Sequence, residues 1–348
     1  MVGSVEEQVR FEAPRSGPVM CGGRHALVSV AATLARDDRD GVLAIVVATS
    51  GSTYRKPGAL VLLDKDGLCA GVLSGGCLEA ELEERAREVL KAGCARRVQF
   101  DTRDEGDRVF GSGSGCRGLM DVVLVPLPAS DAPLRDALID ADRNGVGLDL
   151  DVVPDLGSGE ARVARRRYRF DATGAASHAA PAAGETITLA LAPTPRVVLL
   201  GAGPETPFLL EMMALLGWHA EIVERRERWR DYAQTIGPEL LHAGGLDGLP
   251  ELLAGCRFDA ALVMNHHFDL DARCLRALAT SAVGHVGLLG PRARRDALLG
   301  ELGEALAGRL QPRLHAPVGL DLGGDGPEAI ALAIIAQLQK HLADVANA

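Results

Sequence analysis

Strands and helices alternate along the second half of the chain, and this order constrains the fold more than any other feature of the sequence. Short apolar runs at 196–200, 219–224, 259–264 and 285–290 have the length and composition of buried strands, and helical segments separate them. Strands that are joined by helices pair in parallel, because a parallel connection needs a crossover of a dozen or more residues. The second half is therefore predicted to form a doubly wound parallel sheet.

The turn after the first of these strands has features of a dinucleotide-binding turn. The segment GAGPET at 201–206 follows a strand and opens a helix, so Gly201 and Gly203 occupy the first two positions of the fingerprint GxGxxG. Glu224 ends the next strand, where an acidic residue binds the ribose. The third glycine position holds Thr206. The context predicts a Rossmann-like domain and leaves open whether NAD(P) or another phosphate ligand binds there.

Two histidines follow the strand 259–264, at its carboxyl end. Ligands of open α/β sheets gather at this end of the strands. Adjacent residues of a strand point to opposite sides, so only one of the two imidazoles is expected to face the crevice, and His266 is the candidate. A metal site would need more ligands nearby than this segment offers.

The first half of the chain is predicted to be a smaller mixed α/β domain. The continuous apolar run at 42–49 is typical of a central strand that is buried on both faces, and shorter strands and helices surround it. We expect a disordered tail over residues 1–20, this domain over 21–193 and the Rossmann-like domain over 194–348. Within the first domain, residues 129–193 are predicted to be irregular edge strands and a linker, because Gly, Ala, Ser, Asp and Pro dominate there.

Two glycine-rich loops in the first half end in a cysteine. The first is Ser74-Gly75-Gly76-Cys77, directly before a strongly helical segment, and the second is GSGSGCRG at 111–118. Glycines let the backbone approach a ligand closely, and the first amides of a helix attract anions such as phosphate. A thiolate at a helix start is stabilised and can contact a soft metal. The candidate residues of the second loop are Gly113, Gly115, Cys116 and Arg117, whose guanidinium could bind an anion.

The same cysteines also fit a simpler interpretation, in which Cys77 and Cys116 are small buried residues beside tight turns. The other cysteines, at 21, 69, 94, 256 and 274, lack the glycine-rich setting and are interpreted as packing or surface residues. Seven cysteines make a poor disulfide framework and indicate a reducing, cytoplasmic environment.

Composition excludes several classes of partner. The formal net charge is -10 and aromatic residues make up 3% of the chain, so neither a basic surface nor stacking platforms for nucleic acid are expected. No apolar run reaches the ~20 residues of a membrane span, and the first eighteen residues do not have the pattern of a signal peptide.

Several stretches taken together resemble the XdhC/CoxI family. In the first half these are GSTYRKPGA, GVLSGGCLEAEL and GSGSGCRGLMDVVLVPL, and in the second half they are RVVLLGAGPET, VMNHHFDLD, HVGLLGPRAR and APVGLDLGGDGPEAIALAI. The resemblance runs from about residue 24 to residue 342. It implies a maturation factor for molybdenum hydroxylases, of the xanthine dehydrogenase or carbon monoxide dehydrogenase type. Such factors bind molybdenum cofactor, protect its sulfurated form together with a cysteine desulfurase, and deliver it to the apo-enzyme.

The expectations for function follow from both lines of reasoning. The first is a non-catalytic binding and delivery protein, a homodimer by default, in which Cys77 and Cys116 contact the molybdenum or its sulfur. The second is an NAD(P)-dependent oxidoreductase that uses Gly201, Gly203 and Glu224. No convincing acid–base residue beside a nicotinamide is evident from the sequence, so the delivery protein is preferred.

Overall fold

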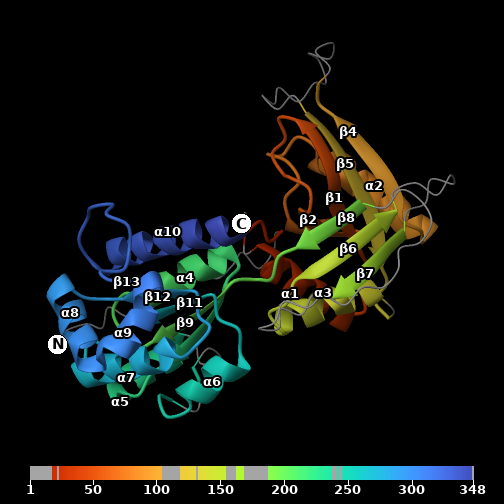
Figure 1. Ribbon diagram of the computed structural model, residues 1–348. Coiled ribbons are helices and arrows are strands. Elements are labelled where there is room, and N and C mark those ends of the chain that lie inside the picture. The colour runs from red at the N-terminus through yellow and green to blue at the C-terminus, as the bar shows by residue number, and fades with distance from the viewer. Residues whose placement is uncertain are drawn as a thin grey trace, which may run out of the picture. The chain divides into compact units, whose positions relative to one another are not determined.

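The computed structural model describes residues 18–21, 23–103, 118–130, 132–153, 162–167, 187–236, 241–242 and 245–346 (Figure 1). The chain divides into two compact units. The first contains residues up to 136 with 150–165 and 180–189, and the second contains 137–149, 166–179 and 190–348. In the described part of the chain, no helix has the length and apolar character needed to cross a membrane.

The first unit is built on an antiparallel sheet with the strand order β3-β2-β1-β5-β4. Its strands are β1 (Gly41–Gly51), β2 (Leu60–Asp64), β3 (Gly67–Gly71), β4 (Arg96–Asp101) and β5 (Gly118–Leu127). The expected central strand is confirmed, because β1 pairs with β2 on one side and with β5 on the other.

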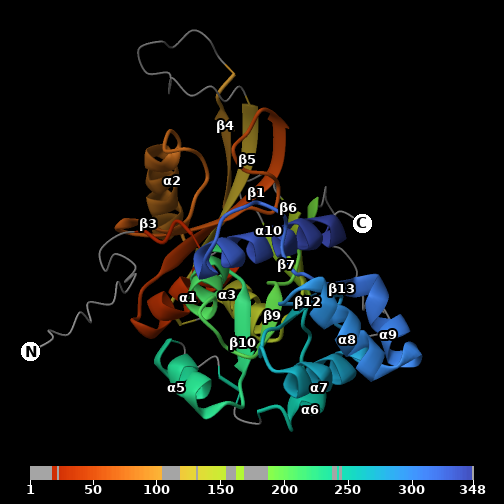
Figure 2. The same ribbon diagram turned by 90° about the vertical axis from the view of Figure 1, so that its left-hand side faces the viewer.

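Both faces of β1 are buried, which explains its continuous apolar sequence. Val42, Ala44 and Val46 point to one face and join the cluster beneath helix α2 (Glu79–Ala92), whereas Leu43 and Ile45 alternate to the other face. Helix α2 lies along the sheet (Figure 2) and buries Leu82, Ala86 and Val89 against it. It ends at Gly93, which takes the left-handed conformation with φ 67°. Helix α1 (Gly23–Arg36) packs against β2 and β3.

The segment 129–193, which was expected to contain irregular edge strands and a linker, contains a helix and three strands. They are α3 (Pro133–Arg143), β6 (Leu148–Val153), β7 (Arg162–Arg167) and β8 (Ile187–Leu191), and the strands form a sheet in the order β7-β6-β8. Helix α3 has a complete apolar stripe, since Leu134, Ala137, Leu138 and Ala141 are all buried. The prediction missed the helix because half of this stripe is alanine, which gives little contrast with the neighbouring small residues.

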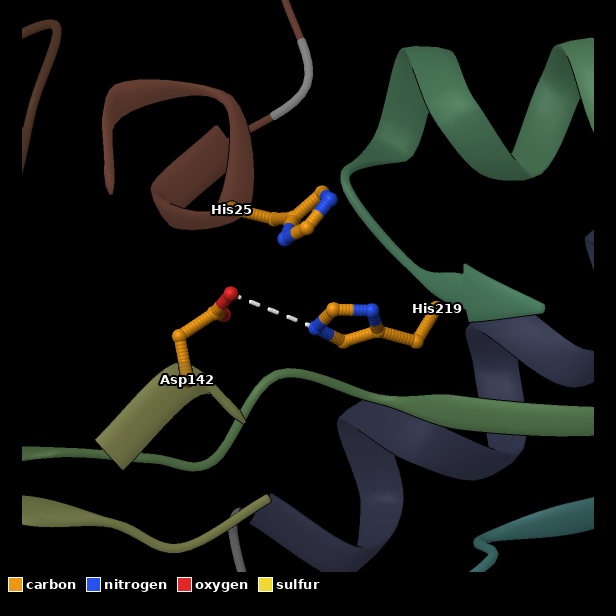
Figure 3. A group of neighbouring side chains, drawn as sticks. All are labelled: His25, Asp142 and His219. Carbon is orange, nitrogen blue, oxygen red and sulfur yellow. Dashed lines mark ion pairs between the residues drawn. The ribbon is translucent and has the colours of Figure 1, made fainter. Parts of the chain in front are cut away.

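The last turn of α3 is fixed by a buried carboxylate. Asp142 accepts a hydrogen bond of 2.6 Å from the Thr194 hydroxyl, and its other oxygen lies 3.3 Å from Nε2 of His219 (Figure 3). All three residues belong to the second unit. Asp142 therefore ties the end of this helix to residues at the start of the parallel sheet.

The second unit contains the predicted parallel sheet, with the strand order β10-β9-β11-β12-β13. Its strands are β9 (Arg196–Leu200), β10 (His219–Val223), β11 (Ala260–Val263), β12 (His285–Leu288) and β13 (Leu314–His315), and all the described pairings are parallel. Strand β9 lies next to β11. From β9 the chain adds β10 on one side of the sheet and then adds β11, β12 and β13 on the other side.

Helices cover both faces of this sheet, so the doubly wound fold is confirmed. On one face, α4 (Thr206–Leu216) and α10 (Pro327–Ala346) share a core with alternate strand residues such as Val197 and Leu199. On the other, α6 (Leu249–Gly255), α7 (Phe268–Ala279) and α8 (Arg292–Leu302) pack against Val198 and Leu200. The remaining helical segments are α5 (Glu227–Ile236), α9 (Glu304–Leu310) and the 3-10 turn η2 (Gln311–Arg313).

Three histidines lie close together in the second unit. His285 is fully buried, its ring stacks on that of His315 at 4.0 Å between centroids, and the His341 ring lies at 4.9 Å. Neither ring nitrogen of His285 has a hydrogen-bond partner in the described part of the chain. Burial lowers the pKa of His285 to about 3, and the neighbouring His315 and His341 add to this effect. The core therefore holds His285 in its neutral form.

We expect the second unit to lose stability as the pH falls. An unfolded histidine has a pKa of about 6.5, so the unfolded chain takes up a proton that folded His285 does not bind until about pH 3. The stabilisation is complete above about pH 6.5 and is lost progressively between the two values, by at most about 5 kcal/mol. Urea unfolding at several pH values, followed by tryptophan fluorescence, measures the slope. His285→Phe should flatten it, whereas replacement of the exposed His267 by Ala should not.

Candidate functional site

The Cys77 loop lines a cavity of about 400 Å³ in the first unit. The cavity is formed where the loops at the ends of β1, β4 and β5 face the loop before α2. Its described lining residues are Ser52, Thr53, Tyr54, Ser74, Gly75, Gly76, Cys77, Leu78, Phe100, Thr102, Gly118 and Met120. Phe100 and Met120 are buried and supply an apolar floor, whereas hydroxyls, backbone and a thiol supply the walls. None of these described lining residues is basic or acidic.

Gly75 and Gly76 expose bare backbone to this cavity. A Cβ atom built on either residue would have no neighbouring heavy atom within 4 Å. Gly76 has φ +113°, a conformation that other residues rarely adopt, so glycine is required there by the backbone. Gly75 has no such requirement, and its missing side chain leaves open space. The predicted close approach of a ligand to this backbone is therefore sterically possible.

A buried serine holds the shape of this loop. The Ser74 hydroxyl oxygen accepts hydrogen bonds of 3.1 Å from the amides of Gly76, Cys77 and Leu78. The same hydroxyl donates to Oε2 of Glu79 at 2.5 Å, and Oε1 of Glu79 accepts from the Ser74 amide at 2.8 Å. Burial raises the pKa of Glu79, but the hydrogen bonds from Ser74 and Leu78 outweigh it and the net shift is downward. Glu79 is therefore held as a carboxylate.

This network changes the interpretation of the anion site. Helix α2 begins at Glu79 with Leu78 as its N-cap, so Cys77 lies one residue before the cap. The amides expected to meet a phosphate already donate to Ser74. The loop thus presents the Cys77 side chain and the glycine backbone to the cavity, rather than a set of unused amide groups.

The opposite wall depends on Gly118. A Cβ on this residue would lie 2.4 Å from the carbonyl oxygen of Ser52 and 2.6 Å from Cγ2 of Thr53, so only glycine lets the two loops meet. Thr102 fixes the same residue: its hydroxyl donates to the Gly118 carbonyl at 2.9 Å and accepts from the Gly118 amide at 3.1 Å. The sequence did not single out Ser52, Thr53 or Thr102 as wall residues, although Ser52 and Thr53 belong to the stretch GSTYRKPGA that carries part of the family resemblance.

Cys77 is the cysteine that faces the cavity, among the described residues. By contrast, burial raises the pKa of both Cys69 and Cys274 to about 12, so these thiols stay protonated, as expected of packing residues. The residues predicted in the second loop, Gly113, Gly115, Cys116 and Arg117, lie outside the described residues. The described chain resumes at Gly118, which lines the cavity.

The dinucleotide-like turn of the second unit is tightly closed. Gly201 has φ +107°, and a Cβ there would lie 2.7 Å from the backbone nitrogen of Asn265. Glu224 is buried, with Oε2 accepting from the Ala202 amide at 2.6 Å and Oε1 from the Arg226 amide at 2.7 Å. Its carboxylate also pairs with the Arg226 guanidinium at 2.6 Å.

Arg226 links this turn to the end of β11. Its guanidinium donates to the carbonyl oxygens of Ala202 and Asn265, at 2.6 Å each, in addition to Glu224. The predicted ribose contact of Glu224 would require this network to open. His266 is exposed beside the turn, with Nε2 3.6 Å from the position of a Cβ on Gly203. The structure thus places Gly201, Gly203, Glu224 and His266 around one turn, and the Glu224 carboxylate is engaged within the protein.

Together these features define a two-unit protein with a thiol-bearing cavity in one unit and a Rossmann-type sheet in the other. Two sequence profiles match the chain: the XdhC Rossmann domain over residues 197–338, and the XdhC and CoxI family over residues 34–101. Together they cover more than half of the chain. The protein belongs to the XdhC and CoxI family. This membership supports an accessory role in the maturation of xanthine dehydrogenase.

The chain is also similar to individual proteins. The chain is 27% identical to a Bacillus subtilis (strain 168) protein described as a probable xanthine dehydrogenase subunit, over 88% of this chain and 94% of that protein. It is 30% identical to the uncharacterized protein YqeB of Escherichia coli (strain K12), over 41% of this chain and 27% of that one. A crystal structure described as a xanthine dehydrogenase (BH1974) from Bacillus halodurans has a TM-score of 0.71 and 28% identity, covering 92% of this chain and 96% of that one.

We expect Ser74→Ala to loosen the cavity loop. The substitution leaves three amides and the Glu79 carboxylate without their common partner, which should cost about 1–2 kcal/mol. Hydrogen exchange followed by mass spectrometry should show faster exchange over 74–82. Ser50 is exposed on the same sheet, so Ser50→Ala is the control. Equal exchange in both variants would mean that the network does not hold the loop.

Proposed function

We propose that this protein binds molybdenum cofactor in the cavity beside Cys77 and delivers it to an apo molybdenum hydroxylase of the xanthine dehydrogenase or carbon monoxide dehydrogenase type. The observation that carries the proposal is the coincidence, in one cavity, of a thiol and two glycines whose backbone is bare. Family membership supplies the client class, and the cavity supplies the place where the cargo would be held.

The residues of the cavity fit the chemistry of this cargo. Molybdenum cofactor consists of a pyranopterin with a phosphate and a dithiolene, whose two sulfurs hold a metal with oxo and sulfido ligands. The apolar side chains of Phe100 and Met120 suit the ring system, since aromatic and thioether groups pack well against rings. Cys77 provides sulfur, which is the ligand type that soft metal centres prefer. The Ser52 hydroxyl is a donor for an oxo group or phosphate, whereas the hydroxyls of Thr53 and Thr102 already donate to the carbonyls of Arg55 and Gly118.

The chain's own residues would act by holding and orienting the cargo. Ser74 and Glu79 keep the turn in the shape that presents Cys77 to the cavity. Gly75 and Gly76 let the cargo reach the backbone. Cys116 and Arg117 of the second glycine-rich loop are proposed to add a sulfur and a cation from outside the described residues. The protein on this proposal is a non-catalytic maturation factor that protects the sulfurated cofactor.

The proposed partners follow from the role in cofactor delivery. The apo-hydroxylase must accept the cargo, and a cysteine desulfurase must supply the sulfido ligand. We propose that the protein is a homodimer in the cytoplasm. An NAD(P)-dependent oxidoreductase is the alternative, but the internal bonds of Glu224 and Arg226 weigh against it, because they occupy the groups that would bind the ribose.

The cavity assignment predicts two variants with less bound molybdenum. Cys77→Ala removes the proposed sulfur contact, and Gly75→Ala places a methyl group in the open space without touching the protein. Each should lower the molybdenum content of protein purified from molybdate-supplied cells at least fivefold, as measured by elemental analysis. Gly300→Ala is the matched control, because its added methyl group also meets nothing within 4 Å, in helix α8. Unchanged molybdenum in both cavity variants would refute the assignment.

The alternative function predicts a different result. Because the Glu224 carboxylate is buried and paired with Arg226, titration with NADH or NADPH should give no saturable fluorescence change in the micromolar range. Saturable micromolar binding, together with turnover of any substrate, would establish the oxidoreductase instead.

A further inference from the structure

The switch point of the parallel sheet carries two buried oxygen atoms that lack partners. The strand order reverses between β9 and β11, and ligands of such sheets bind outside the carboxyl ends of the strands at this point. Glu205 follows β9 and Asn265 follows β11. Glu205 is 7% exposed and Asn265 0% exposed, yet Glu205 Oε2 and Asn265 Oδ1 have no hydrogen-bond partner among the described residues. A buried carboxylate oxygen without a partner is costly, so it requires an explanation.

The Glu205 oxygen and a histidine nitrogen face the same small space. The position that a Cβ on Gly203 would occupy lies 2.8 Å from Glu205 Oε2 and 3.6 Å from His266 Nε2. These two side chains supply the nearest heavy atoms to this position, apart from the chain neighbours of Gly203. Glycine at 203 therefore leaves this position, between a carboxylate and an imidazole, unoccupied by a side chain, and we call this position the gap.

The backbone of His266 is held in a conformation that brings its ring to this gap. His266 has φ 54°, in the left-handed region that residues other than glycine seldom enter. The preceding residue is fixed from two directions. Asp271 accepts from the Asn265 amide at 3.2 Å, and Arg226 donates to the Asn265 carbonyl at 2.6 Å. Such strained residues cluster at binding sites, where the surrounding structure maintains them.

The negative charge of the Glu205 carboxylate determines which kind of ligand can bind in the gap. A carboxylate at the start of helix α4 repels a pyrophosphate, which is the group that a dinucleotide would place here. A cation is attracted instead. Carboxylate oxygen together with imidazole nitrogen is a ligand set for divalent transition metals such as zinc, cobalt and manganese.

We propose that Glu205 and His266 form a site for a divalent transition-metal ion at the switch point of the second unit, with water completing the coordination. The site is independent of the cavity beside Cys77. It gives the buried carboxylate a counter-charge, and it gives the Rossmann-type turn a role other than dinucleotide binding.

Cobalt(II) is a suitable probe, because its visible absorption reports the ligands. The full chain carrying Cys77→Ser, which removes the cavity thiol, is titrated with Co²⁺ and dialysed, and bound metal is counted by elemental analysis. Glu205→Gln and His266→Gly should each lower the affinity of one site at least tenfold and change its absorption. Glycine at 266 accepts φ 54° without strain, so the His266→Gly variant is expected to fold even if Glu205→Gln does not.

Two controls match these variants. Glu211→Gln changes an exposed carboxylate on the same helix, α4, and His267→Ala removes the neighbouring exposed imidazole. Both should bind Co²⁺ as the parent does. The proposal is overturned if the parent binds no Co²⁺ that is sensitive to His266→Gly.

Discussion

The hydroxyl of Ser74 is the contact on which the cavity of the first unit depends. One oxygen atom gathers three consecutive amides, and Glu79 orients it from the first turn of α2. Without this arrangement the amides would need water or an anion as their acceptor, and the loop would have no single conformation. The serine thus does inside the protein what a bound anion does in many glycine-rich loops. Within this loop, the groups left for a ligand are the Cys77 thiol and the backbone of Gly75 and Gly76.

The two units divide the chemistry of the protein between them. The cavity has no charged side chain among its described lining residues and offers sulfur, hydroxyls and an apolar floor. The switch point of the parallel sheet is instead dense in charge, with Glu224 neutralised by Arg226 and Glu205 left with an unpartnered oxygen. A soft, flat cargo suits the first environment and a small cation suits the second. A common nucleotide-binding fold therefore does not imply a nucleotide ligand here.

The sequence was sufficient for the central strand of the first unit and the parallel sheet of the second, though not for helix α3, because apolar runs and their spacing determine which strands are buried. The run at 42–49 predicted the central strand, and the regular alternation after 196 predicted the parallel sheet. Side-chain partners were harder to foresee. No pattern indicated that Ser74 would take the loop amides, since its three acceptor contacts arise from the fold of one turn. The burial of Glu224 was equally hidden, because it depends on partners distant in the sequence: the Ala202 amide bonds its carboxylate, and Arg226 also bonds the carbonyls of Ala202 and Asn265.

The paired hydrogen bonds between Thr102 and Gly118 have a consequence for substitutions in the segment that joins these two residues. They close the end of the β4–β5 pair, so the register of both strands is settled before the chain leaves the sheet. Replacing Cys116 or Arg117 should therefore alter the proposed contacts with the cargo and leave the pairing of β4 with β5 unchanged.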